Sequence, residues 1–378
     1  MIVPFNRPQS TGREFDYIKA AIDAGKIGGN GEFTAKCEAL LEKQLGIKKA
    51  LLTTSCTAAL EMAALLLDTQ PGDEVIVSSF TFPSTANAFV LRGAGPVFVD
   101  IRSDTLNMDE SKIERLTTAR TKAILAMHYA GVGCEMETIL DLARDRSIPV
   151  IEDNAHGLFG KYQGKYLGTF GCMAAQSFHD TKNFTCGEGG GLLINDERFV
   201  ARAEIIREKG TNRARYFRGE VDKYTWVDLG SSYAPSDILA AFLLAQLEAR
   251  EKIQQERERI WNFYAEHLRD WAEQCQVQLL VAPKHTEHPF HLFFVVMKTG
   301  DQRDRLIAHL RQAGVQSAFH YVPLHLSQMG RSFGSKSGDC PVSESVSERL
   351  LRLPFYNGLT NDELEHVVAV IQKFRPCI

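Results

Sequence analysis

The chain has 378 residues, of which 44% are hydrophobic and 24% are charged, and its formal net charge is -4. This length predicts two domains rather than one simple core, and the slightly acidic balance argues against a general nucleic-acid binder, which would be basic. No apolar run approaches the length needed to cross a bilayer. Residues 1–8 lack the charged region and apolar core of a signal peptide.

The cysteine pattern predicts free thiols. None of the eight cysteines forms a Cys-x-x-Cys pair or a spacing typical of a zinc site; they are Cys37, Cys56, Cys134, Cys172, Cys186, Cys275, Cys340 and Cys377. Reduced thiols are typical of the cytosol, so we expect a cytoplasmic protein without disulfides.

From about residue 45 to 195, short apolar segments alternate with amphipathic ones. This alternation predicts an α/β fold with a mostly parallel sheet and helices on both faces. The expected strands cover residues 49–53, 74–78, 96–100, 122–128, 149–153, 174–178 and 191–194. The expected helices cover residues 57–67, 85–92 and 136–146.

The pattern changes after a long helical period over residues 236–268. Beyond it, the sequence predicts a smaller α+β unit with strands over 277–281, 292–297 and 315–319 and helices over 303–312, 345–351 and 361–373. We therefore expect a large domain over residues 1–250 and a small C-terminal domain over residues 251–378.

Three segments place reactive side chains at the carboxyl ends of predicted strands, where ligands gather in an open parallel sheet. Ser55-Cys56-Thr57 follows the first strand and opens a helix, whose N-terminus can hold a phosphate. Asp153 ends a central strand, where a carboxylate can pair with a protonated pyridine nitrogen. Lys182 follows the strand over 174–178 and can reach the same space. A lysine for a Schiff base, a carboxylate and a phosphate turn are what pyridoxal phosphate (PLP) chemistry requires.

Each of these features has a simpler interpretation when taken alone. A serine before a helix is often only an N-cap, and a carboxylate at a strand end is commonly a solvated turn residue. An isolated lysine is usually on the surface, and the glycine run over 187–191 lacks the Gly-Lys-Ser/Thr ending of a P-loop. Their joint occurrence, in this order, favours an enzyme.

On these segments the chain resembles the DegT/DnrJ/EryC1/StrS family of sugar aminotransferases, which have the fold-type I, aspartate-aminotransferase-like fold of PLP enzymes. The resemblance covers nearly the whole chain. Besides the lysine segment it includes Ser55-Cys56-Thr57-Ala58-Ala59-Leu60, Phe98-Val99-Asp100-Ile101, Thr121-Lys122-Ala123-Ile124, His128-Tyr129-Ala130-Gly131, Glu152-Asp153-Asn154-Ala155-His156, His320-Tyr321-Val322-Pro323-Leu324-His325 and Leu353-Pro354-Phe355-Tyr356.

The resemblance implies a role for each matching position. Lys182 would hold PLP covalently and carry a proton between substrate and cofactor, and Asp153 would pair with the pyridine nitrogen. His156 would face the phenolic oxygen of the cofactor, and Phe82 would stack on its ring. The phosphate would be held by Cys56, Thr57 and Ser177 and, across the interface of a homodimer with shared active sites, by Ser232.

Two departures from the family pattern bear on the phosphate. Ser232-Tyr233-Ala234 stands where relatives have Asn-Tyr-Arg, so we expect a weaker contact from the neighbouring subunit. Cys56 replaces a glycine, and the turn accepts this change only if φ at Cys56 is negative.

The resemblance implies an enzyme that moves an amino group from L-glutamate to C4 of a nucleotide-linked 4-keto-6-deoxyhexose. The resemblance is strongest to the branch that converts dTDP-4-keto-6-deoxy-D-glucose into dTDP-4-amino-4,6-dideoxy-D-galactose for enterobacterial common antigen. It rests there on residues 54–62, 178–183, 207–213, 222–226 and 229–233.

Several alternatives stay open. The same chemistry could give the gluco epimer or act on another nucleotide-linked keto sugar. A PLP-dependent sugar dehydratase would carry histidine in place of Lys182, and a PLP-fold regulatory protein would need a DNA-binding domain for which the chain has no spare length.

Other residues carry no firm assignment. His285, His288 and His291 are spaced by three but precede a strand rather than lie on a helix, so we expect no metal site. A basic run could be a solvated surface or could bind a nucleotide diphosphate; its members are Arg213, Arg215, Arg218 and Lys223. His320 and His325 flank a proline turn that could line the sugar pocket.

Overall fold

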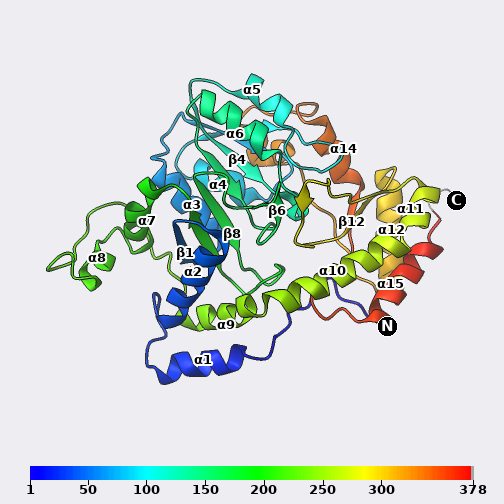
Figure 1. Ribbon diagram of the computed structural model, residues 1–378. Helices are drawn as coiled ribbons and strands as arrows, with labels where there is room; N and C mark the ends of the chain where they lie inside the picture. Colours follow the sequence, from blue (N-terminus) through cyan, green and yellow to red (C-terminus); the bar gives the residue numbers. More distant parts are fainter. Residues whose placement is uncertain (376–378) are drawn as a thin grey trace.

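The computed structural model describes residues 1–375, so Cys377 lies outside the described residues. A seven-stranded sheet forms the centre of the larger half, in the order β1-β9-β8-β5-β4-β2-β3 (Figure 1). β9 pairs antiparallel with β1 and β8, whereas the other pairs are parallel. The strands are β1 (Lys49–Thr53), β2 (Glu74–Ser78), β3 (Gly95–Val99), β4 (Thr121–Met127), β5 (Val150–Asp153), β8 (Met173–Ser177) and β9 (Gly190–Ile194).

Helices cover both faces of this sheet, as predicted. Alternation of side chains along β1 sends Leu51 towards one layer and Leu52 towards the other. The Leu51 layer contains α3 (Cys56–Leu66), α4 (Pro83–Val90) and α7 (Val200–Arg207). The other face is covered by α2 (Glu32–Leu45), α6 (Met136–Asp145) and α9 (Asp237–Glu248). The mostly parallel α/β fold is therefore confirmed.

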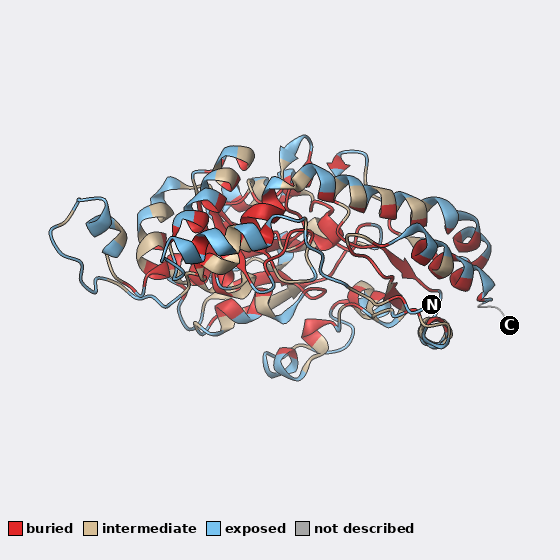
Figure 2. Cartoon of the chain, turned by 90° about the horizontal axis from the view of Figure 1, so that it is seen from below, coloured by how far each residue is buried: buried red, intermediate tan, exposed pale blue. Residues whose placement is uncertain are grey.

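The C-terminal part of the chain builds a second core around a three-stranded antiparallel sheet in the order β10-β12-β13. Its strands are β10 (Gln278–Leu279), β12 (Phe294–Val296) and β13 (Leu350–Arg352). The helices around it are α10 (Arg250–His267), α11 (Arg269–Cys275), α12 (Gly300–Gln312), α14 (Pro341–Arg349) and α15 (Asn361–Lys373). Figure 2 shows the buried strands at the centre and the exposed outer turns of the helices.

Short elements connect these two parts. β6 (Lys161–Tyr162), β7 (Lys165–Tyr166) and β11 (Thr286–Glu287) form a third sheet, in the order β11-β6-β7. The remaining helices are α1 (Glu14–Asp23), α5 (Ile113–Leu116), α8 (Arg213–Phe217) and α13 (Gln328–Ser332), with 3-10 turns over Glu110–Lys112, Tyr129–Gly131, Glu197–Phe199 and Leu324–Leu326. Within residues 1–375, no helix is both long enough and apolar enough to span a membrane.

Three predictions in the second half of the chain were wrong. The helical period over 236–268 is two helices, because the chain leaves helical geometry at Ala249 (φ -84°, ψ 14°) and lets α9 pack on α1 and α2 while α10 packs on α15. The helix predicted over 345–351 stops at Arg349, because Leu350 and Leu351 pair with β12. The strand predicted over 315–319 makes only isolated bridges, from Val315 to Val3 and from Ala318 to Arg352.

Candidate active site

A cavity of about 760 Å³ lies at the carboxyl ends of the parallel strands and is lined on the other side by residues of the C-terminal part. It brings together most of the residues that the sequence singled out, from segments more than 100 positions apart: Cys56, Thr57, Phe82, Asp153, His156, Ser177 and Lys182. Ser232 does not line it.

The turn between β1 and α3 forms an anion cradle. Ser55 caps α3, because its hydroxyl accepts a hydrogen bond from the Ala58 N–H at 3.1 Å. The N–H groups of Cys56 and Thr57, the first two helical residues, have no partner within residues 1–375. Cys56 is absent from the residues with positive φ, so the condition under which this turn accepts a cysteine is met. Free amides at a helix N-terminus favour a phosphate.

Asp153, at the end of β5, is held with its carboxylate in the cavity. One oxygen accepts from the Thr85 hydroxyl at 2.7 Å and the other from the Ala155 N–H at 3.1 Å. The residue is only 5% exposed. Two donors therefore fix an acceptor that can pair with a protonated ring nitrogen.

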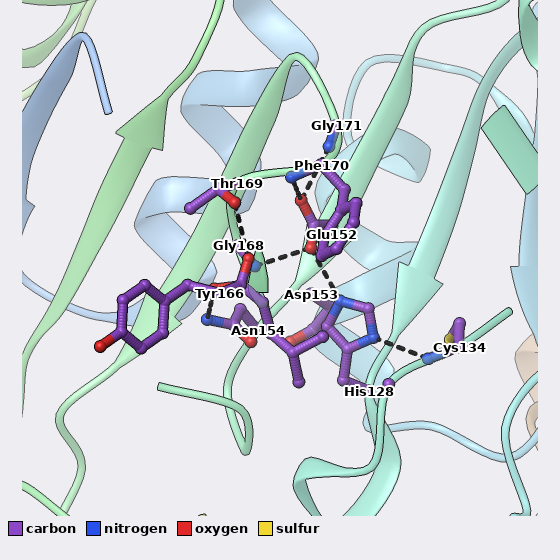
Figure 3. A network of polar contacts seen from close by, with 12 residues as sticks. His128, Cys134, Glu152, Asp153, Asn154, Tyr166, Gly168, Thr169, Phe170 and Gly171 are labelled. Atoms are coloured by element: carbon purple, nitrogen blue, oxygen red, sulfur yellow. Dashed lines mark hydrogen bonds and ion pairs between the residues drawn. The ribbon is translucent and has the colours of Figure 1, made fainter. Parts of the chain in front are cut away.

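Glu152, the other carboxylate of this strand, points to the opposite face and has a structural role (Figure 3). It accepts hydrogen bonds from the N–H groups of Gly168 (2.7 Å), Phe170 (2.7 Å) and Gly171 (2.8 Å). The fourth bond, at 2.9 Å, comes from Nε2 of His128, whose Nδ1 accepts from the Cys134 N–H at 3.1 Å. This buried network anchors β5 and thereby the position of Asp153.

Lys182 lies in the loop after β8. Its backbone N–H bonds to the His179 carbonyl at 3.0 Å, while its half-buried side chain has no hydrogen-bond or ion-pair partner among residues 1–375. Burial lowers the pKa of Lys182 to about 8, against the opposing effects of Cys56 and Asp153. A lysine amine with a lowered pKa is a good nucleophile towards carbonyl groups.

Three buried imidazoles line the same cavity. Nδ1 of His156 accepts a hydrogen bond from the Ala130 N–H at 3.3 Å, which leaves the ring hydrogen on Nε2. His156 stacks on His291 with ring centroids 4.1 Å apart, and His320 bonds through Nδ1 to the Tyr129 hydroxyl at 3.1 Å. Burial holds the pKa of all three histidines well below its usual range, so each ring is neutral at neutral pH.

The histidines spaced by three do not converge. His285 contacts Glu135 at 3.2 Å, His288 packs edge-on against Trp261, and His291 alone reaches the cavity. In the part of the chain that the structure describes, no group of three or more His, Cys, Asp or Glu side chains is arranged to hold a metal ion.

The remaining candidates lie outside the cavity or at its edge. Phe82 is 58% exposed at the cavity rim, and exposed Ser232 pairs its backbone with Glu208. His325 is buried between Ser79 and Glu344. None of the basic residues of the 213–223 run lines the cavity; Arg215 and Arg218 instead pair with nearby glutamates.

Some cavity residues were not predicted from the sequence: Ser84, Thr85, His291 and Arg352. Ser84 accepts a hydrogen bond from the Thr57 hydroxyl at 2.8 Å. Thr85 comes three residues after Phe82, at the start of α4. This closeness to Phe82 was the one signal in the sequence that could have pointed to Thr85 as a cavity residue. Arg352 belongs to the other end of the chain, and only the fold brings it here.

The residues of the cavity fit PLP. A lysine and two helix-end amides that have no partner among the described residues, together with a carboxylate held by two donors, match the aldehyde, the phosphate and the ring nitrogen of the cofactor, respectively. When bound, PLP supplies an electron sink that stabilises negative charge on a substrate carbon.

Comparison with known proteins agrees with this site. A model described as the DegT/DnrJ/EryC1/StrS aminotransferase family matches residues 8–372. An uncharacterized protein of Methanocaldococcus jannaschii is 36% identical over 353 residues, covering 91% of this chain and 90% of the relative. GDP-perosamine synthase of Escherichia coli O157:H7 is 31% identical over 376 residues, and the alignment covers 98% of this chain and 98% of the relative. The PLP form of a Streptococcus pneumoniae protein assigned as a sugar aminotransferase superposes with a TM-score of 0.90 at 26% identity, again over 98% of each chain.

Proposed function

Because the chain belongs to the DegT/DnrJ/EryC1/StrS family of PLP-dependent sugar aminotransferases, we propose that it aminates C4 of dTDP-4-keto-6-deoxy-D-glucose with L-glutamate as donor. The product would be dTDP-4-amino-4,6-dideoxy-D-galactose, used for surface polysaccharide such as enterobacterial common antigen. The observation that carries the chemistry is the meeting of Lys182, Asp153 and the α3 N-terminus in one cavity. The dTDP sugar follows from the sequence segments that resemble this branch of the family.

Within this proposal each residue has a defined task. Lys182 holds the cofactor covalently and moves the proton at the reacting carbon. Asp153 holds the proton on the ring nitrogen, His156 donates from Nε2 to the phenolic oxygen, and Phe82 covers the ring. The phosphate is bound by Cys56, Thr57 and Ser177 of one subunit and Ser232 of its partner.

We also propose a homodimer with shared active sites, because Ser232 is exposed and does not line the cavity of its own chain. The division into residues 1–250 and 251–378 is proposed to separate the PLP-binding domain from the small one. The seven described cysteines are free thiols, which favours a reducing compartment, and we place the enzyme in the cytoplasm.

A second candidate substrate is a GDP-linked 4-keto-6-deoxyhexose. It is favoured by the 31% identity, over 98% of each chain, to the GDP-perosamine synthase of E. coli. The gluco epimer of the product is a third outcome of the same chemistry. A dehydratase is disfavoured, because Lys182 is retained.

The test is to mix the purified protein with PLP, L-glutamate and either dTDP-4-keto-6-deoxy-D-glucose or its GDP-linked counterpart, and to read product formation by NMR. A small H3–H4 coupling in a dTDP-linked product supports the galacto assignment, and a large one moves the enzyme to the gluco branch. Amination of the GDP sugar alone would overturn the nucleotide assignment. Lys182→Ala is the negative control, and retained turnover in this variant would contradict the mechanism.

A further inference from the structure

His291 is a buried cavity residue to which the proposed mechanism gives no task. It lies three residues before β12, in the C-terminal part of the chain, and is 6% exposed. One edge of its ring bonds to Asn183, the residue after Lys182, and its face stacks on His156. His291 therefore contacts the immediate neighbour of one cofactor residue and the side chain of another.

The bond to Asn183 fixes where the His291 ring carries its hydrogen. Nδ1 of His291 lies 2.8 Å from the Asn183 amide oxygen. The Asn183 amide nitrogen donates to the Pro289 carbonyl at 2.6 Å, so the amide oxygen is the atom that faces the imidazole, and it can only accept. Nδ1 of His291 is therefore the donor, and this directed bond sets the orientation of the ring.

The backbone on both sides of this bond is anchored by one buried arginine of α10. The Arg257 guanidinium donates to the carbonyls of Phe290 (2.8 Å) and His291 (2.5 Å) and to the Asn357 amide oxygen (3.0 Å). The Asn357 amide nitrogen in turn donates to the Asn183 carbonyl at 3.4 Å. His291 and the loop of Lys182 are thus held against each other by a rigid set of bonds.

The His156 ring, in contrast, has few bonds of its own. Within residues 1–375 its ring makes one hydrogen bond, which it accepts at Nδ1 from the Ala130 N–H at 3.3 Å. One bond leaves the ring free to turn about it, so a second contact must fix the ring plane. His291 supplies this contact, with ring centroids 4.1 Å apart and an interplanar angle of 24°. The rings of Tyr129 and His320 lie further away, at 6.0 and 6.1 Å.

The plane of the His156 ring matters because its Nε2–H is the donor proposed for the phenolic oxygen of PLP. A hydrogen bond weakens steeply when the donor turns away from its acceptor. Nε2 lies across the ring from the bonded Nδ1, so a tilt of the ring about Nδ1 moves the donor. A histidine that merely fills the core would have no such influence on a bound cofactor.

Both stacked rings keep their neutral form across the neutral pH range. The titratable and charged groups around His291 are His156, Lys182, Arg257 and Arg352, and they add to the effect of burial, which lowers the pKa of His291 well below its usual range. Burial, Lys182 and Arg352 do the same for His156. The donor on His156 is therefore present at every pH at which the cofactor would be titrated.

We propose that His291 is a positioning residue for the cofactor: its stack on His156 aims the Nε2–H of that ring at the phenolic oxygen, and its bond to Asn183 ties this donor to the loop of Lys182. The proposal rests on the proposed PLP-dependent function. It gives the C-terminal part of the chain a share in setting the chemistry of a cofactor that the central sheet holds.

The consequence to be measured is a change in the acidity of the bound cofactor. A donor to the phenolic oxygen stabilises the anionic form of that oxygen. When the donor turns away, the proton shared between this oxygen and the nitrogen that joins the cofactor to Lys182 is held more tightly, so its pKa rises. The pH-dependent absorbance of bound PLP reports this pKa without any turnover.

The test compares His291→Asn with the wild type in the PLP-loaded protein, without amino acid or sugar. Asparagine keeps a donor for Asn183 but has no ring to stack on His156. We expect the midpoint of the absorbance titration to rise by about 0.5 to 1 pH unit, the effect of weakening one hydrogen bond, with PLP content unchanged. Because no substrate is present, a contact between His291 and a substrate cannot cause the shift.

The matched control is His288→Asn, three residues earlier, which removes an imidazole that packs edge-on against Trp261 and does not line the cavity. Its midpoint should equal that of the wild type. His291→Phe, which restores a ring for the stack but lacks the donor to Asn183, should shift the midpoint by less than half as much as His291→Asn. If His291→Asn does not fold, His291→Gln, which fills more of the space of the ring, takes its place with the same expected shift.

A double-variant cycle asks whether His291 acts through His156. In a His156→Ala background, His291→Asn should add no further shift, because a positioning residue acts only through the group that it positions.

Four results would overturn the assignment: an unchanged midpoint in His291→Asn, an equal shift in His288→Asn, an equal shift in His291→Phe, or the same shift with and without the His156 side chain. Failure of the proposed function is distinguishable, because a wild-type protein that binds no PLP, or that releases no 2-oxoglutarate from glutamate, is no PLP-dependent transaminase. If the wild type does both while His291→Asn titrates normally, only the assignment of His291 fails.

Discussion

Lys182 differs from a surface lysine in the pH at which its amine loses the proton. Burial lowers its pKa from 10.5 to about 8, so the neutral amine is present above that pH and is lost as the pH falls below it. We expect the rate of covalent PLP attachment to cofactor-free protein to rise with pH through about 8 and then level off. Stopped-flow absorbance measures this rate. A rate that keeps rising towards pH 10.5 would contradict a lowered pKa of the Lys182 amine.

At the residue scale, the sequence pointed to side chains that act at strand ends. Lys182, Asp153 and the Ser55 turn were predicted because each ends or follows a recognisable strand, and the carboxyl ends of parallel strands meet at one edge. Glu152 and Asp153 looked alike in sequence, and only the alternation along β5 separates the anchoring carboxylate from the one in the cavity. Arg352 and His291 carry no local signal, because their place in the cavity depends on how the C-terminal part packs.

At the element scale, β9 must approach the turn between β1 and α3 closely. A Cβ added at Gly190 would lie 2.3 Å from the backbone nitrogen of Cys56 and 2.3 Å from the carbonyl carbon of Ser55. We expect Gly190→Ala to push this turn aside, to lower stability by about 1–3 kcal/mol and to weaken PLP binding at least tenfold.

A matched control for this substitution lies in the same glycine run. Gly187 has φ +85°, but a Cβ there would meet nothing within 4 Å. Gly187→Ala should therefore cost about 1–2 kcal/mol of backbone strain and leave PLP affinity unchanged. Urea titration measures the loss of stability, and PLP titration measures the loss of cofactor affinity. Equal PLP affinity in both variants would contradict a role of the anion cradle in PLP binding.

The buried hydrogen bonds of Glu152 lead to a second prediction at the scale of elements. Glu152→Gln replaces one acceptor oxygen by an amide donor that faces groups already donating, so buried hydrogen bonds are lost. We expect the free energy of unfolding to fall by about 3 kcal/mol, measured by urea denaturation. The same change at exposed Glu258 should cost no more than about 0.5 kcal/mol. Similar losses in both variants would show that the network does not anchor β5.

The elements themselves were predictable to very different degrees. Every strand of the central sheet was placed within one residue, because short apolar segments alternate there regularly with amphipathic helical ones. The strands of the small sheet are two or three residues long, and such segments have no periodicity of their own. β13 was predicted as helix because the period of α14 leads into it, and the pairing with β12 decides its conformation.

At the scale of the whole molecule, one arm carries apolar side chains that no other residue of the described range 1–375 covers. α8 and the residues after it project from the body (Figure 1), and Phe217, Trp226 and Leu229 are 69%, 75% and 50% exposed. Exposed aromatic groups on one segment are typical of protein interfaces.

We therefore expect sedimentation at micromolar concentration to give twice the chain mass of 42.2 kDa. Changing Phe217 and Trp226 to serine should shift the protein towards monomer and weaken PLP binding, because Ser232 of the partner subunit would be lost from the site. A wild-type monomer with full PLP affinity would contradict the shared site.

The central claim is that Lys182 is the residue that carries the cofactor of an aminotransferase. The most direct test is borohydride reduction of the PLP-loaded protein followed by peptide mass spectrometry, with and without prior addition of L-glutamate. The label should lie on Lys182, and glutamate should prevent labelling while one equivalent of 2-oxoglutarate appears. A label on another lysine, or one that glutamate leaves unchanged, would contradict the account.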